Sequence, residues 1–105
     1  MRTVEFRHLL DESNAIRVRF ELDQGTVLKF MVQLECLIDY EWTAVVRYDT
    51  AHHFAHCDRL HPYEPAQKAR MATQNYNEAL THAMGDLTGN WDSYRRRYKQ
   101  WLKQK

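Results

Sequence analysis

Residues 16–38 decide the fold, and they read I-R-V-R-F-E-L-D-Q-G-T-V-L-K-F-M-V-Q-L-E-C-L-I. From Ile16 to Leu22, apolar residues alternate with charged ones, which is the pattern of a strand with one buried and one solvated face. Gly25 then predicts a tight hairpin turn, because glycine adopts positive φ without strain. The alternation resumes from Thr26 to Ile38, with the core face predicted at Leu28 and every second residue after it. Two long antiparallel strands follow from this stretch.

Similar alternation on both sides of this hairpin extends the predicted sheet. Residues 4–10 and 42–48 each place apolar side chains at every second position. A short segment around His56 supplies a fifth strand. Because the connections are short, successive strands are expected to be neighbours in an antiparallel meander. We therefore predict four or five strands over about residues 3–61.

A long helix is predicted for the C-terminal part of the chain. Asn75 is a good N-cap, and Glu78 three residues later completes a capping-box pattern. The apolar positions that follow are spaced by three or four residues: Tyr76, Leu80, Ala83, Leu87, Trp91, Tyr94, Tyr98 and Trp101. One helix over about residues 75–103 keeps these side chains on one face. The linker at 62–74, which contains two prolines, is predicted to be irregular or to form a short helical turn.

These elements predict an α+β fold, in which a four- to five-stranded antiparallel meander packs against one long C-terminal helix. The 105 residues are enough for one domain, spanning 1–105, and too few for two. The two cysteines are too few for a disulfide scaffold, and no apolar run is long enough to cross a membrane. With no signal-peptide pattern at the N-terminus, we expect a cytoplasmic protein with no membrane partner.

Val45 to His61 is the stretch with the most functional potential, and it reads V-V-R-Y-D-T-A-H-H-F-A-H-C-D-R-L-H. It contains four of the six histidines in the chain. A turn beginning at Asp49 would fold it into a hairpin, because aspartate readily bonds to its own backbone two residues on. The predicted catalytic residues in this hairpin are Arg47, Asp49, His53, His56 and Asp58.

General acid–base chemistry is the first interpretation of this cluster. Unperturbed imidazoles exchange protons near neutral pH, and an arginine can hold a phosphate with two hydrogen bonds. Arg47 would bind phosphate, His53 and His56 would exchange protons, and Asp49 or Asp58 would orient an imidazole. Such a set of residues could cleave RNA by activating the 2′-hydroxyl group of the RNA itself, without a metal or another cofactor.

Two other interpretations of the histidines stay open. A zinc site needs three or four close ligands, and the spacings here match no known zinc motif, so no metal ligand is assigned. The histidines could also be structural, bonded to the backbone of a polar hairpin. In that case Arg47 and Asp49 would form a surface ion pair of little energetic value, about 0–1 kcal/mol.

The C-terminal end of the predicted helix is strongly basic. Residues 95–105 contain six positive and no negative side chains, interleaved with aromatic rings. Cations that bind phosphate beside rings that stack on bases are typical of nucleic-acid surfaces. Arg95, Arg96 and Lys99 are therefore predicted to bind nucleic acid. The alternatives are docking of an acidic protein and a solvated helix end that complements the helix dipole.

Arg47 to His56, R-Y-D-T-A-H-H-F-A-H, resembles the R-Y-D-x-x-H-x-x-x-H segment of a set of small prokaryotic proteins of unknown function. Their helices carry N-Y-N-E-A-like and N-W-x-x-Y-R motifs, which stand here at 75–79 and 90–95. A related R-Y-D-N-A-P-H-H pattern is found in TumE-like toxins of toxin–antitoxin pairs, although this chain lacks the proline. The second resemblance implies a small toxin–antitoxin protein that binds RNA, or cleaves it, and has a cognate protein partner.

A second hypothesis is a non-catalytic interaction module. The aromatic stripe of the predicted helix could then hold two copies of the chain together as a homodimer. Substitution of His56 separates the two hypotheses, because the module predicts a change in stability or partner affinity only.

Overall fold

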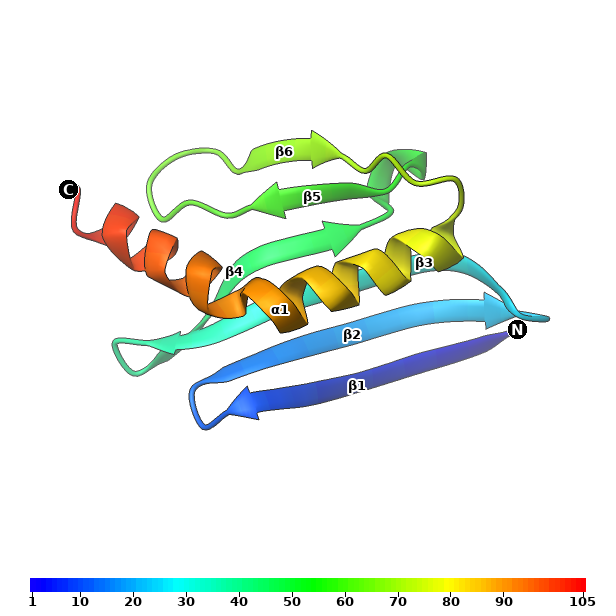
Figure 1. The fold of residues 1–105 in the computed structure, drawn as a ribbon, viewed down its shortest axis with the longest axis horizontal. Coiled ribbons are helices and arrows are strands. Elements are labelled where there is room, and N and C mark those ends of the chain that lie inside the picture. The colour runs from blue at the N-terminus through cyan, green and yellow to red at the C-terminus, as the bar shows by residue number, and fades with distance from the viewer.

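The computed structural model describes all 105 residues, which form one six-stranded antiparallel sheet with a single long helix on one face (Figure 1). The elements in chain order are β1 (Arg2–Asp11), β2 (Asn14–Asp23), β3 (Thr26–Ile38), β4 (Glu41–Asp49), η1 (Ala51–His53), β5 (His56–Arg59), β6 (Gln67–Arg70) and α1 (Tyr76–Leu102). Each strand pairs with its neighbour in the sequence, so the sheet is a simple meander. This confirms the α+β class and the C-terminal helix.

The predicted strand number was too low, because β6 lies in the segment predicted to be an irregular linker. Its sequence, Gln67 to Arg70, has no alternation of apolar and polar residues, and all four residues are exposed. The strand forms by backbone pairing with β5, in which Arg70 stands opposite His56 and Lys68 opposite Asp58. An edge strand that buries no side chain leaves no period-2 pattern in the sequence.

The β2–β3 hairpin turns at the predicted place. Asp23 pairs with Thr26, and the two residues between them, Gln24 and Gly25, have φ values of 49° and 82°. Two successive positive φ values match the right-handed twist of the flanking strands.

Two irregularities in strand pairing change which residues face the core. Between β2 and β3 the register shifts so that Leu22 pairs with Val27 and Glu21 with Lys29. Val27 is therefore buried, whereas Leu28, predicted to be in the core, is 45% exposed. A second shift in β4 leaves Val45 as the extra residue, and it is buried. Bulges of this kind cannot be read from alternation, because they change its phase.

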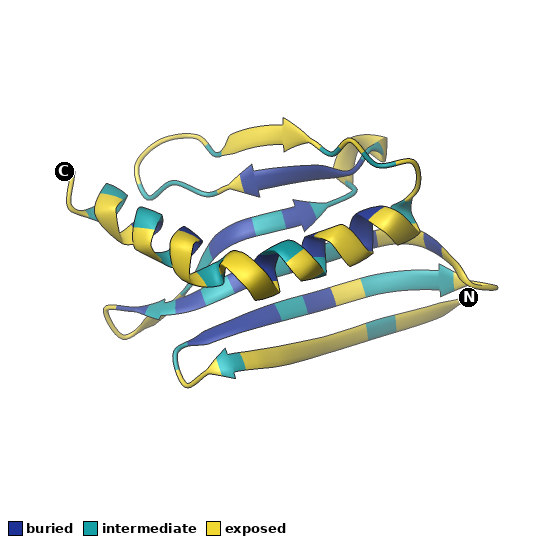
Figure 2. Ribbon diagram, viewed as in Figure 1, coloured by how far each residue is buried: buried dark blue, intermediate teal, exposed yellow.

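The core lies between α1 and one face of the sheet, as the buried positions in Figure 2 show. The helix packs mainly on β3 and less on β4. The largest completely buried side chains are Leu34, Leu87, Val18, Val32, Val46 and Cys36. The two edge strands, β1 and β6, are mostly exposed.

The start of α1 is fixed by three side chains. The Asn75 side chain accepts a hydrogen bond from the Glu78 backbone N–H at 2.9 Å, which is the predicted N-cap. The Glu78 carboxylate accepts from the Gln74 N–H at 3.4 Å, so the capping box does not close on Asn75 itself. Asn77 bonds both Val27 N–H and the Gly25 carbonyl, at 3.0 and 2.9 Å, and so attaches the helix to the β2–β3 turn.

The aromatic stripe of α1 is used inside the molecule. Tyr94 and Tyr98 are buried against the sheet, and Trp101 stacks on His61 with ring centres 4.5 Å apart. These rings of the stripe therefore have partners within the chain, and a homodimer through the stripe stays a prediction.

Leu87→Ala should lower the free energy of unfolding by roughly 2–5 kcal/mol, the usual cost of emptying a fully buried leucine site. Leu87 is 0% exposed and lies at the centre of the helix–sheet contact. Urea unfolding measures this change. Thr88→Ala, on the exposed side of the same turn, is the matched control and should change the value by less than about 0.5 kcal/mol. Equal effects of the two substitutions would contradict the assigned core.

Candidate functional site

The face of the sheet opposite α1, called here the open face, is crossed by a row of polar residues. Directly paired positions contribute one residue from each strand: Arg7, Arg17, Gln33, Arg47, Asp58 and Lys68. Paired residues in adjacent strands point to the same side of a sheet, so these side chains are neighbours. Arg47 Nε donates to Gln33 Oε1 at 2.7 Å, and Lys68 Nζ donates to Asp58 Oδ2 at 3.3 Å.

Glu35 joins the middle of this row. Its Oε2 accepts from Arg17 Nε at 3.0 Å and from Gln33 Nε2 at 2.8 Å, and Arg7 Nε lies 3.7 Å from Oε1. Burial opposes ionisation of this carboxyl, but the hydrogen bonds from Arg17 and Gln33 outweigh it and lower the pKa of Glu35. Much of the charge on the open face is therefore paired within the sheet.

His56 lies on the same face, between two carboxylates. Its Nδ1 is 3.2 Å from Asp58 Oδ1, and its Nε2 is 2.6 Å from Asp49 Oδ1. The first contact is a hydrogen bond, whereas Nε2 has no hydrogen-bond partner despite its short distance to Asp49. The residue is 5% exposed, and the Phe54 ring centre is 5.4 Å from its own. His56 is thus a buried link between β4 and β5.

The turn between these strands holds His52 and His53. Asp49 Oδ1 accepts from the Ala51 N–H at 3.1 Å, the predicted aspartate turn, and Thr50 Oγ1 accepts from the Phe30 N–H at 3.2 Å. His52 and His53 have φ values of 68° and 69°, which is uncommon and costly for residues other than glycine. Both histidines are nevertheless exposed. Backbone strain of this kind is concentrated at functional sites in proteins.

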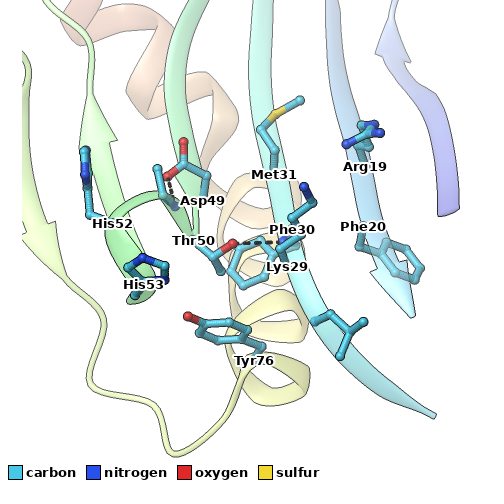
Figure 3. Close-up of a pocket in the computed structure, with 12 residues that line it drawn as sticks. Arg19, Phe20, Lys29, Phe30, Met31, Asp49, Thr50, His52, His53 and Tyr76 are labelled. Carbon is cyan, nitrogen blue, oxygen red and sulfur yellow. Dashed lines mark hydrogen bonds between the residues drawn. The ribbon is translucent and has the colours of Figure 1, made fainter. Parts of the chain in front are cut away.

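A pocket of about 490 Å³ lies beside this turn, where β4 ends and β3 continues (Figure 3). We call it the His52–His53 pocket. Its polar lining residues include Arg19, Lys29, Asp49, Thr50, His52 and His53. Its apolar lining residues include Phe20, Leu28, Phe30, Met31 and Tyr76. Two imidazoles, two cations and aromatic rings therefore line one cavity.

The pocket contains only part of the predicted catalytic set. Asp49 and His53 line it, whereas Arg47, His56 and Asp58 do not. Arg47 is bonded to Gln33 and paired opposite Asp58 within the polar row. Both nitrogens of the buried His56 lie close to carboxylates, which hold its ring in place between β4 and β5. These contacts suit a positioning role for His56, and its predicted role in proton exchange stays a prediction.

Three residues of the pocket were missed from the sequence: His52, Arg19 and Lys29. The signal for Arg19 and Lys29 was the length of the β2–β3 hairpin, which extends past the end of β4 and brings these two cations beside the turn. Arg19 pairs with Met31, and Met31 pairs with Asp49, so the strand register connects all three strands at this end.

The basic end of α1 is partly engaged in the fold. Arg95 donates to Asn14 Oδ1 at 2.8 Å and to the Leu37 carbonyl at 3.0 Å, so it attaches the helix to the ends of β2 and β3. Arg96 and Lys99 are exposed. Of the three residues predicted to bind nucleic acid, Arg95 therefore has a clear structural role.

A second polar cluster, which the sequence did not reveal, joins α1 to β4. Asp86 Oδ2 accepts from Tyr48 Oη at 2.6 Å and from Tyr94 Oη at 2.7 Å, and Asn90 donates to Oδ1 at 2.8 Å. Burial, followed by the hydrogen bond to Asp86, raises the pKa of Tyr94 to about 12 and that of Tyr48 further. Burial opposes ionisation of Asp86, but the three hydrogen bonds outweigh it and lower its pKa.

The fold and site define a small α+β protein, a meander backed by a helix, with a histidine-lined pocket at the end of the sheet where β4 stops. The model of the family described as Domain of unknown function (DUF7718) matches residues 1–104, so the chain belongs to this family. No curated protein and no solved structure matches it. The helix is not apolar enough to cross a membrane, and no three histidine, cysteine, aspartate or glutamate side chains are arranged to hold a metal ion.

Asp86→Asn should lower stability at neutral pH by about 1 kcal/mol, because the two tyrosines lose a charged acceptor. The pKa of Asp86 is lowered by folding, so its ionisation stabilises the fold above the ordinary value of 3.8. That contribution disappears as the pH falls through the lowered value. Thermal unfolding measured between pH 7 and pH 2 should therefore show that the variant loses less stability on acidification than the parent chain does. Asp92→Asn, on the exposed side of α1, is the control, and an unchanged slope in Asp86→Asn would contradict the assignment.

Proposed function

We propose that this protein binds RNA in the His52–His53 pocket and cleaves it through the RNA's own 2′-hydroxyl group, without metal. The observation that carries the proposal is the presence of two exposed imidazoles and two cationic side chains around one cavity. Imidazoles serve as general base and general acid near neutral pH, and cations stabilise the charge that develops on a phosphate.

The proposed reaction assigns a role to each polar group of the pocket. One of His52 and His53 accepts the proton of the 2′-hydroxyl as its oxygen attacks the adjacent phosphorus. The other donates a proton to the 5′-oxygen as the phosphorus–oxygen bond breaks. Lys29 and Arg19 would hold the non-bridging phosphate oxygens. The products are a 2′,3′-cyclic phosphate and a 5′-hydroxyl end, and the protons taken up and released balance.

The apolar lining of the pocket suits a nucleobase. Phe20 and Tyr76 are aromatic lining residues, and stacking of a base on an aromatic ring contributes about 1–3 kcal/mol. RNA bases that are free of a duplex can reach such rings, so the preferred substrate would be single-stranded.

His56, Asp49 and Asp58 would act in this proposal as positioning residues. The His56 contacts connect Asp49, at the end of β4, to Asp58, in β5. Asp49 in turn bonds the backbone of the turn that bears both exposed histidines. Loss of the His56 ring would thus disturb the catalytic turn without removing a reacting group.

Membership of a toxin–antitoxin pair is the biological setting we propose for this activity. It rests on the resemblance of the Arg47–His56 segment to TumE-like toxins. A cognate antitoxin protein would then restrain RNA cleavage in the cell.

His52→Ala and His53→Ala should each slow cleavage of a short mixed-sequence RNA about 10²- to 10⁴-fold, the usual range for loss of a general acid or base. The purified proteins are assayed with and without chelator, and the product ends are identified. His82→Ala, an exposed histidine of α1 outside this pocket, is the matched control and should retain full activity. Cleavage by the parent chain that is abolished by chelator, or that survives both pocket substitutions, would overturn the proposed chemistry.

A further inference from the structure

The β1 strand forms a long edge of the sheet, and no strand pairs with its outer side. Its ten residues, Arg2–Asp11, pair only with β2, and no backbone hydrogen bond reaches its outer side. The opposite edge, β6, has four residues. Unpaired N–H and carbonyl groups along an edge are a template for another strand, and proteins usually protect long edges with proline, lysine or a covering segment. The β1 sequence contains neither proline nor lysine.

Apolar surface accompanies these free backbone groups. Phe6 and Leu9 are 40% and 60% exposed, on opposite faces of the strand. Since α1 packs on β3 and β4, the helix side of β1 stays uncovered. A cavity of about 210 Å³ lies there, lined by Phe6, His8, Ile16, Val18, Met84 and Thr88. An added strand would cover both the backbone edge and this apolar surface.

We propose that β1 pairs antiparallel with β1 of a second copy of this chain, about a two-fold axis that passes beside Phe6. A two-fold axis perpendicular to the sheet keeps equivalent faces together. The two sheets would then become one continuous twelve-stranded sheet, with both helices on the same side. This follows from adding the six strands of each copy.

Charge complementarity selects this register. With Phe6 opposite Phe6, residues 2–10 all pair, and Glu5 of each copy stands opposite Arg7 of the other. A register centred on Glu5 opposes two glutamates, and one centred on Arg7 opposes two arginines, which is destabilising. Registers centred nearer either end of β1 pair fewer residues. Glu5 and Arg7 have side-chain exposures of 55% and 36%, and their ion pairs within the chain, with Arg19 at 3.8 Å and with Glu35 at 3.7 Å, are long. Both side chains can therefore turn towards a partner across the edge.

The contact leaves the proposed RNA site free. The His52–His53 pocket is built from β2, β3, the turn after β4 and the start of α1, and no residue of β1 lines it. Dimerisation would instead join the polar rows of the two open faces end to end at Arg7. Failure of this interface would therefore say nothing against RNA cleavage, and the reverse also holds.

Disulfide trapping tests the register directly. In Phe6→Cys, the two introduced thiols face each other across the axis, and directly opposed strand residues have Cα atoms about 4.5–5.5 Å apart, within disulfide range. In Val4→Cys, each thiol stands opposite His8, roughly 13 Å along the strand from its equivalent, so it cannot cross-link. The native Cys36 and Cys57 are buried and give a low background. Phe6→Cys should form disulfide dimers under mild oxidation, and Val4→Cys should not.

Sedimentation of the parent chain over a concentration series gives the second readout. A species of twice the 12.7 kDa chain mass is expected. Glu5→Arg, which opposes two pairs of arginines in the proposed register, should shift the dimer equilibrium towards monomer. A single-chain mass at every concentration, with Phe6→Cys cross-linking no faster than Val4→Cys, would overturn the proposal. Efficient cross-linking of Val4→Cys alone would reject the Phe6-centred register.

Discussion

The packing of α1 on only one face of the sheet is the constraint on which the rest of the structure depends. The helix stripe from Ala79 to Tyr98 buries the apolar face of β2, β3 and β4, and nothing within the chain covers the other face. That second face must therefore be polar, and its charged side chains pair across the strands around Glu35 and Asp58. The helix does not extend over β1, so apolar side chains of this edge strand stay exposed.

The same constraint explains which parts of the fold the sequence predicts. Strands β2 and β3 bury one face each, so they alternate clearly, and α1 buries one stripe, so its spacing is regular. The β6 strand buries nothing and leaves no pattern, although it supplies the partners of His56 and Asp58. The sequence also did not reveal the register shift near Leu28. The alternation of apolar and polar residues continues on both sides of the bulge, but its phase changes there.

The site was predicted less well than the fold, since its residues meet through strand register rather than through sequence spacing. The hairpin pattern placed Asp49 beside His56 but did not show that the His56 ring is buried, with the Phe54 ring next to it. Likewise, Lys29 and Arg19 are far from the histidines in sequence, and they reach the pocket because the β2–β3 hairpin extends past Asp49. We propose that the buried His56 holds a strained turn, and that this turn presents His52 and His53 to an RNA phosphate.

The most direct test of this proposal is an NMR titration, in which the histidine imidazole signals are followed as a non-cleavable single-stranded oligonucleotide is added. The account predicts that the His52 and His53 signals shift together and saturate with one affinity, while those of His61 and His82 stay in place. His56→Gln should weaken this response. Shifts confined to His82 or to the basic end of α1, or no shift of His52 and His53 at saturating ligand, would contradict the account.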